Sequence, residues 1–159
     1  MKKLMVMLVC MLVFLCGCGA KEEVVSKDVN ISKLFDDMKA TLDQQGAFIE
    51  MMDFTSDDMT LLYGIETAEV SQFAGSISKV GTNSDEILLL EVSASADAKK
   101  VAEKLETRYQ AKANEAKDYL PKEYEKIQNC TVLQNGNFVA LIVHSEYATL
   151  KDMWTQAVQ

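Results

Sequence analysis

The residues best suited to nucleophilic chemistry in this sequence are Cys130 and His144, because a thiol beside an imidazole can form a hydrolytic or group-transfer dyad. Both lie in a predicted β-hairpin whose two-residue turn we place at Asn135-Gly136. That turn pairs Cys130 with Leu141, so His144, three positions further along the strand, points to the opposite face of the sheet. The pattern predicts a core cysteine and no dyad, and we expect alanine at both positions to leave the fold intact.

Acidic residues supply a second kind of candidate chemistry. Asp53, Asp57 and Asp58 are close enough in sequence to be considered as Ca²⁺ ligands, but segment 53–58 lacks the alternating ligands and turn glycine of an EF-hand loop. Asp57 and Asp58 are better explained as first-turn residues of a helix, where the helix dipole favours negative charge. We therefore expect no metal and no cofactor, although cation binding by these three aspartates stays open.

Carboxylate pairs could also hydrolyse glycosidic bonds, and the sequence offers acidic residues at 36–37, 53, 57–58 and 85–86. Nothing in their spacing selects one pair. The sequence contains no phosphate-binding glycine loop, nucleophile elbow or dinucleotide fingerprint. One histidine and one thiol outside the N-terminal segment are also too few ligands for a structural zinc site.

The N-terminal segment has the pattern of a bacterial lipoprotein signal. Lys2-Lys3 precedes an uncharged stretch at 4–15, which is too short to span a bilayer. Leu15-Cys16-Gly17-Cys18 then matches a lipobox, with small residues before the cysteine that is lipidated. We predict cleavage between Gly17 and Cys18 and lipidation of Cys18. Residues 1–17 are then the signal peptide, 18–29 the lipidated cysteine with a short tether, and 30–159 one globular domain.

Composition limits the partners of the mature chain. Cleavage leaves 142 of the 159 residues, and loss of Lys2 and Lys3 changes the net charge from −8 to −10. Such a chain is repelled by nucleic acid and by anionic lipid head groups, so membrane attachment has to come from the lipid. Cys130 is the only thiol left after lipidation, and no internal disulfide is available.

Hydrophobic periodicity predicts alternating helical and extended segments. Capping residues and glycines mark several boundaries, including Asn30, Thr55 or Ser56, Gly64, and Ser95 or Asp97. Segment 48–54 is ambiguous. The predicted helices are 30–45, 56–63, 97–119, 123–128 and 146–158, and the predicted strands are 70–80, 86–92, 131–134 and 137–144.

The long helix has one apolar and one charged side. Its apolar stripe is expected to face the core, whereas its charged side is expected to be solvated. That charged side comprises Lys99, Glu103, Lys104, Glu106, Arg108, Lys112 and Glu115.

These elements predict a single-domain α+β fold: an antiparallel sheet of two hairpins separated by a long helix, with the N-terminal and C-terminal helices packed on it. The apolar run Ile87-Leu88-Leu89-Leu90 predicts a central strand covered on both faces. The second apolar face of the last hairpin is covered either by a helix, which we favour, or by another copy of the chain. Its residues are Leu133, Phe138, Ala140 and Ile142.

Several segments, taken in order, resemble a known family. They are 61–65, 85–87, the lysine-rich helix ending near Arg108, 119–121 and 135–139. With the lipobox before them, the chain resembles the small lipoproteins of domain-of-unknown-function family 4358, over residues 31–154. The resemblance implies an envelope address and the same fold, and it implies no enzyme.

We therefore expect a non-enzymatic binding or accessory domain, lipid-anchored at the extracytoplasmic face of the cell membrane. Its expected partners are the membrane, through the N-terminal lipid, and an envelope protein or a cell-wall peptide, but not nucleic acid. An envelope hydrolase that acts on cell-wall material through unplaced carboxylates is the alternative.

Overall fold

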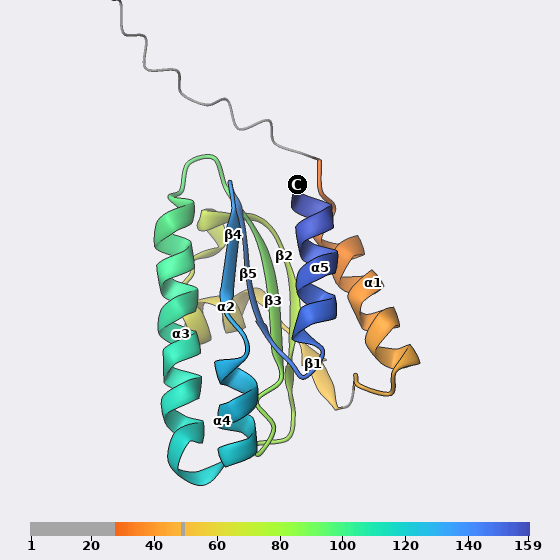
Figure 1. The fold of residues 1–159 in the computed structure, drawn as a ribbon. Coiled ribbons are helices and arrows are strands. Elements are labelled where there is room, and N and C mark those ends of the chain that lie inside the picture. The colour runs from red at the N-terminus through yellow and green to blue at the C-terminus, as the bar shows by residue number, and fades with distance from the viewer. Residues whose placement is uncertain (1–27, 49) are drawn as a thin grey trace, which may run out of the picture.

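The computed structural model describes residues 28–48 and 50–159, which form an α+β domain (Figure 1). The sequence predicted this fold class correctly. The helices are α1 (Ile31–Gln44), α2 (Ser56–Tyr63), α3 (Ala98–Tyr119), α4 (Pro121–Gln128) and α5 (Tyr147–Val158), with a short 3-10 turn, η1 (Thr67–Glu69). The strands are β1 (Met51–Asp53), β2 (Val70–Ser78), β3 (Glu86–Val92), β4 (Val132–Asn135) and β5 (Phe138–Val143).

The five strands form one antiparallel sheet in the order β1-β2-β3-β5-β4. Hairpins β2–β3 and β4–β5 lie on either side of α3 in the chain, as predicted, and the ambiguous segment before α2 adds the edge strand β1. Strand β3 lies at the centre. Its apolar side chains alternate between two cores, because successive residues of a strand point to opposite faces.

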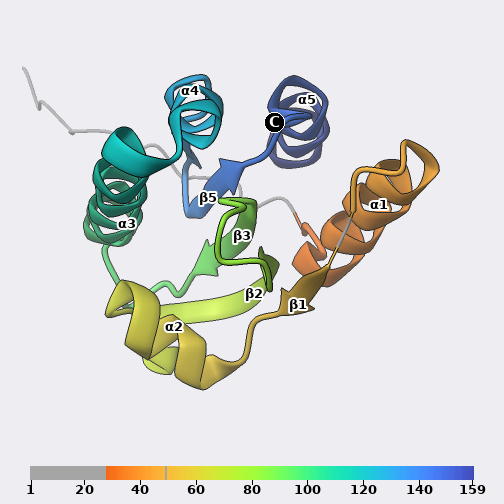
Figure 2. The same cartoon turned by 90° about the horizontal axis from the view of Figure 1, so that it is seen from below.

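Helices cover both faces of the sheet. Figure 2 shows α1 and α5 on one side and α2, α3 and α4 on the other. The α1–α5 side buries Phe138, Ala140 and Ile142 of β5 together with Leu150 and Trp154. The second face of the last hairpin is therefore covered by helices of the same chain, which was the favoured prediction.

Local signals set most helix ends as predicted. Asn30 accepts a hydrogen bond from the Lys33 amide, Thr55 forms a capping box with Asp58, and Asp97 caps α3. Helix α4 begins at Pro121 rather than at residue 123, because proline is well suited to the first helical position.

The predicted turn of the last hairpin is wrong by one residue, which shifts the pairing of its two strands by two residues. Asn135 pairs with Phe138, so the turn residues are Gly136 and Asn137, and Gly136 supplies the left-handed conformation with φ 57°. Tertiary hydrogen bonds hold this register: Asn137 accepts from the Val92 amide, and the Asn135 side chain donates to the Val158 carbonyl.

No helix within residues 28–48 and 50–159 is long and apolar enough to cross a membrane. The predicted signal segment 1–17, the cleavage site at Gly17 and the lipidation site at Cys18 lie outside the described residues.

Candidate functional site

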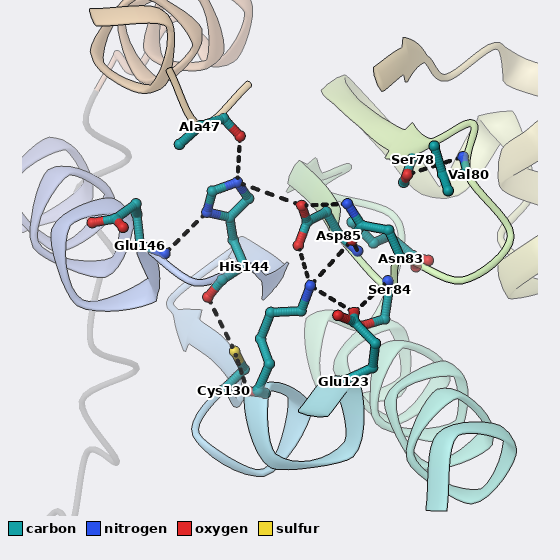
Figure 3. Close-up of polar contacts among 12 residues, drawn as sticks. Ala47, Ser78, Val80, Asn83, Ser84, Asp85, Glu123, Cys130, His144 and Glu146 are labelled. Atoms are coloured by element: carbon teal, nitrogen blue, oxygen red, sulfur yellow. Dashed lines mark hydrogen bonds and ion pairs between the residues drawn. The ribbon is translucent and has the colours of Figure 1, made fainter. Parts of the chain in front are cut away.

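The side chains of Cys130 and His144 do not form a dyad (Figure 3). The Cys130 thiol donates to the backbone carbonyls of Lys126, at 3.2 Å, and His144, at 3.7 Å. The His144 ring instead lies 3.2 Å from the Ala47 carbonyl through Nε2 and accepts from the Glu146 amide through Nδ1. Burial raises the pKa of the Cys130 thiol, which disfavours the nucleophilic thiolate. The predicted core cysteine is confirmed, since a two-residue shift of pairing leaves each side chain on the same face.

His144 nevertheless has a structural role that strand parity did not predict. It is 1% exposed and joins the segment after α1 to the start of α5. Alanine at this position would remove both hydrogen bonds and leave a cavity, so the expectation that His144 is dispensable for the fold is withdrawn.

A polar network beside His144 joins the loop before β3 to α4 (Figure 3). The Lys126 ammonium lies 2.6 Å from Asp85 and 2.7 Å from Glu123, and Glu123 also accepts from the Ser84 amide and hydroxyl. Burial alone would raise the pKa of Glu123, but the hydrogen bonds from Lys126 and Ser84 lower it overall. Asp85 and Glu123 therefore share Lys126 as an internal counterion, and their contacts hold the loop before β3 against α4.

A second cluster surrounds the fully buried Glu86 at the start of β3. Its carboxylate accepts from Tyr63 at 2.7 Å, from Arg108 at 2.8 and 3.1 Å, and from Lys112 at 2.7 Å. Desolvation would raise the pKa of Glu86, yet Lys112 and Arg108 outweigh it and hold the pKa below its ordinary value. Desolvation also raises the pKa of Tyr63 well above its ordinary value, which keeps the phenol protonated as a donor.

This cluster corrects the prediction that the whole charged side of α3 is solvated. Lys112 is 7% exposed, and the Arg108 side chain is 17% exposed. Both reach across to the sheet because Glu86 lies beneath them, and a buried carboxylate needs cations and donors around it.

Two of the three aspartates considered as cation ligands, Asp53 and Asp58, have partners of their own. Asp58 completes the capping box with Thr55, which lowers the pKa of Asp58 through hydrogen bonds. Asp53 lies 3.9 Å from the Lys39 ammonium, which also pairs with Asp36. In the described part of the chain, no group of three or more His, Cys, Asp or Glu side chains could hold a metal ion.

A cavity of about 730 Å³ lies at the opposite end of β3 from Glu86. Small residues around the start of α3 and the last hairpin turn make most of its wall; its lining is Ser71, Glu91, Val92, Ser93, Ala94, Ala96, Ala98, Gly136 and Asn137. A groove of about 400 Å³ between α4 and α5 is smaller, and two polar residues of its wall, the partly buried Lys126 and the buried His144, already have partners. The larger cavity is therefore the better candidate for a ligand site.

Glu91, a partly buried residue near the end of β3, borders this cavity. Its carboxylate accepts from the Gln72 amide at 2.7 Å and the Asn137 amide at 3.1 Å. Among the described residues, no Lys, Arg or His forms an ion pair with Glu91. The Asn137 Oδ1 atom is buried and has no hydrogen-bond partner in the same part of the chain. Glu91 has the strand parity of Ile87 and Leu89, so its carboxylate lies on the α1–α5 side of the sheet, whereas Val92, Ala96 and Ala98 of the cavity wall pack on the α3 side.

Sequence reasoning missed Glu91, Gln72 and Asn137 as a group. A usable signal existed, because Glu91 is one of only two charged residues in the otherwise apolar strand Glu86–Val92. The hairpin turn was recognised, but only as a turn. Its role in bringing Asn137 to Glu91 depends on β5 lying beside β3, which residue spacing does not reveal.

Comparison with known proteins gave one match. A family model described as "Domain of unknown function (DUF4358)" matches residues 44–144, a range that includes β3, the polar network and the cavity. No curated protein matches the chain, and no solved structure matches it.

Proposed function

The chain belongs to the DUF4358 family of unknown function, and we propose that it is a lipid-anchored extracytoplasmic domain that binds a ligand of the cell envelope in the cavity beside the start of α3. The observation that carries this proposal is the cavity of about 730 Å³, whose wall combines serine and asparagine residues with small alanine side chains. A binding site needs polar groups that are held in place but still available to a ligand.

The lipid anchor is supported by the lipobox at 15–18 and by the charge and length of the segment before it. A Cys18→Ser chain is expected to leave the membrane fraction, whereas wild type stays there. Retention of Cys18→Ser in washed membranes would argue against the anchor.

Ion pairing favours binding over the hydrolase alternative. Three buried or partly buried carboxylates are each held by a lysine or arginine: Glu86 by Arg108 and Lys112, and Asp85 and Glu123 by Lys126. A glycosidase needs one carboxylic acid and one carboxylate flanking a shared space. These three groups are instead used to hold elements of the fold together.

The proposed partner class is an envelope protein or a cell-wall peptide. A mature net charge of −10 disfavours nucleic acid and anionic membrane surfaces. Peptides provide both the polar groups and the small apolar surface that a cavity lined by serine and alanine can accept.

The test is retention of envelope material by the full chain, carrying a C-terminal affinity tag and purified in detergent. Ala94→Trp should fill the exposed wall of the cavity and abolish retention of material that wild type holds. Leu61→Trp is the matched control, because Leu61 is 81% exposed on α2, away from the cavity. Equal retention by wild type and Ala94→Trp, or no specific retention by wild type, would contradict the proposal.

A further inference from the structure

We infer that the outer edge of β4 binds an extended peptide segment of a partner protein by strand addition. This edge is separate from the cavity, so the site goes beyond the proposed function. Three features of the edge support strand addition: its free backbone groups, its uncharged side chains and the helices that flank it.

Strand β4 has a hydrogen-bonded neighbour on one side only, because it ends the order β1-β2-β3-β5-β4. At the start of the neighbouring strand, the Asn137 carbonyl accepts from a backbone amide of β3. The backbone groups of successive strand residues alternate in direction, so Phe138 and Ala140 direct theirs towards β4. Their partners there are Asn135 and Leu133.

The other two residues of β4 direct their backbone groups outward. Because Leu133 and Asn135 bond to β5, the N–H and C=O groups of Val132 and Gln134 point away from the sheet. In the described part of the chain, none of these four groups has a hydrogen-bond partner. An extended peptide complements such a row, because its backbone offers donors and acceptors at the same spacing.

The side chains of β4 do not block an added strand. Sheets usually protect an exposed edge with charged residues, proline or a bulge. The other edge strand, β1, is protected in this way: it has three residues, ends at Asp53 and follows Glu50, whose φ is 52°. Strand β4 has the sequence Val-Leu-Gln-Asn, pairs in regular register and contains no charge and no proline. Its outer edge is therefore open to pairing.

Helices on both faces limit the occupant to a single extended strand. The Thr131 hydroxyl lies 2.6 Å from the Tyr147 hydroxyl at the start of α5, and the Asn135 side chain donates to the Val158 carbonyl at the end of α5. Helix α5 therefore runs beside the whole of β4, and α3 packs on the other face (Figure 1). Pairing with a second copy would place helices of both copies over strands about 4.8 Å apart, whereas packed helices need about 8–10 Å. A single peptide strand avoids this conflict.

Charge selects among extended peptides. The chain carries a net charge of −8, whereas β4 itself is uncharged. A peptide with a β-branched, uncharged centre and a lysine or arginine at each end matches both features. Its centre suits a strand, and its ends are attracted by the negative charge of the protein.

The experiment titrates the full chain in detergent with the acetylated and amidated hexapeptide Lys-Val-Thr-Val-Thr-Lys. The same peptide with its four central amide nitrogens methylated is the control ligand, because those nitrogens can no longer donate to a strand edge. We expect saturable binding of the unmethylated peptide alone, with slower hydrogen exchange at the Val132 and Gln134 amides. The Leu133 and Asn135 amides, which already bond to β5, should exchange at nearly the same rate as before.

A substitution at the exposed Gln134 tests the edge directly. Gln134→Pro removes one outward N–H group and no hydrogen bond to β5, so the peptide should bind about tenfold or more weakly. Gln134→Ala is the matched control, because it removes the same side chain and keeps the N–H group. Ala94→Trp alters the cavity and should leave peptide binding unchanged, which distinguishes failure of this site from failure of the proposed function. If Gln134→Pro does not fold, the exchange rates of wild type still decide the question.

Four results would overturn the inference. They are the absence of peptide binding, equal binding of the methylated and unmethylated peptides, binding without slower exchange at the two outward amides, and slow exchange of both amides before peptide is added. In the last case, a second copy or another part of this chain would already occupy the edge. Equal affinity for a peptide with glutamate at both ends would overturn the charge preference.

Discussion

Strand β3 carries a glutamate near each end, and the two carboxylates have opposite surroundings. Glu86 is fully buried and accepts hydrogen bonds from Arg108, Lys112 and Tyr63. Glu91 is only partly buried, borders a cavity and is held by two neutral amides. The first carboxylate is satisfied within the fold, whereas the second still lacks a cation among the described residues.

The difference separates a carboxylate on which buried cations depend from one that is held by neutral donors alone. A buried carboxylate with two cations links α3 to the sheet, and removing any one of the charges leaves the others uncompensated. Removing the charge of a carboxylate held by two amides leaves no buried cation behind. The comparison predicts that substitutions at the Glu86 end change stability far more than those at the Glu91 end.

The largest expected effect is that of Glu86→Gln. Arg108 and Lys112 would remain buried without a carboxylate, and the free energy of unfolding should fall by about 3–5 kcal/mol. Glu91→Gln, which loses one charged acceptor at a cavity wall, should lower it by about 1 kcal/mol or less. Urea denaturation of both variants measures the difference, and equal losses would show that the two ends do not differ as described.

A smaller loss is expected for Gln72→Ala, which tests how the Glu91 end is held. The substitution removes hydrogen bonds to Val29, Ile31 and Glu91, and should lower the free energy of unfolding by about 1–2 kcal/mol. Hydrogen exchange at the Ile31 amide should become faster. Gln134→Ala is the control, because Gln134 is exposed and makes one long contact, of 3.4 Å, to Gly136; an equal loss there would argue against a specific role for Gln72.

The smallest expected effect is the loss of the contribution of Glu86 to stability as the pH is lowered. The folded-state pKa of Glu86 lies below its ordinary value of 4.5, so the unfolded chain binds the proton first as the pH falls. The contribution of Glu86 is therefore fully present above about pH 4.5 and is lost as the pH falls through the lower folded-state pKa. One proton gives a slope of at most about 1.4 kcal/mol per pH unit.

Denaturation curves at several values between pH 3 and pH 6 isolate this contribution when wild type is compared with Glu86→Gln. The slope of wild type should exceed that of the variant in the acidic range. Identical slopes would mean that the ion pairs do not favour the charged form of Glu86.

Most of the fold could be predicted from local patterns. The apolar stripe of α1, the caps at Asn30, Thr55 and Asp97, and the hydrophobic run of β3 each report on residues close in sequence. These signals place the elements and the α+β class correctly. The family, which was recognised from short segments such as 61–65 and 135–139, is confirmed by the match over residues 44–144. The signal segment and the lipid anchor stay predictions.

The candidate site could not be predicted in the same way. Helical periodicity placed Arg108 and Lys112 on a charged face, but it could not show that this face lies over Glu86. Likewise, Glu91 is hydrogen-bonded to Gln72, which lies 19 residues earlier in the sequence, and to Asn137, which lies 46 residues later. Only the order of strands in the sheet brings them together.

The sequence by itself therefore determined the helices, the strands, their apolar faces and the absence of a thiol–imidazole dyad. The tertiary structure decided which charged side chains are paired with a cation and which are held by neutral donors alone. The physical reason is that amphipathic periodicity records whether a residue prefers water or the core, over a few neighbouring positions. Compensation of a charge depends on groups far along the chain, and packing alone determines which of them meet.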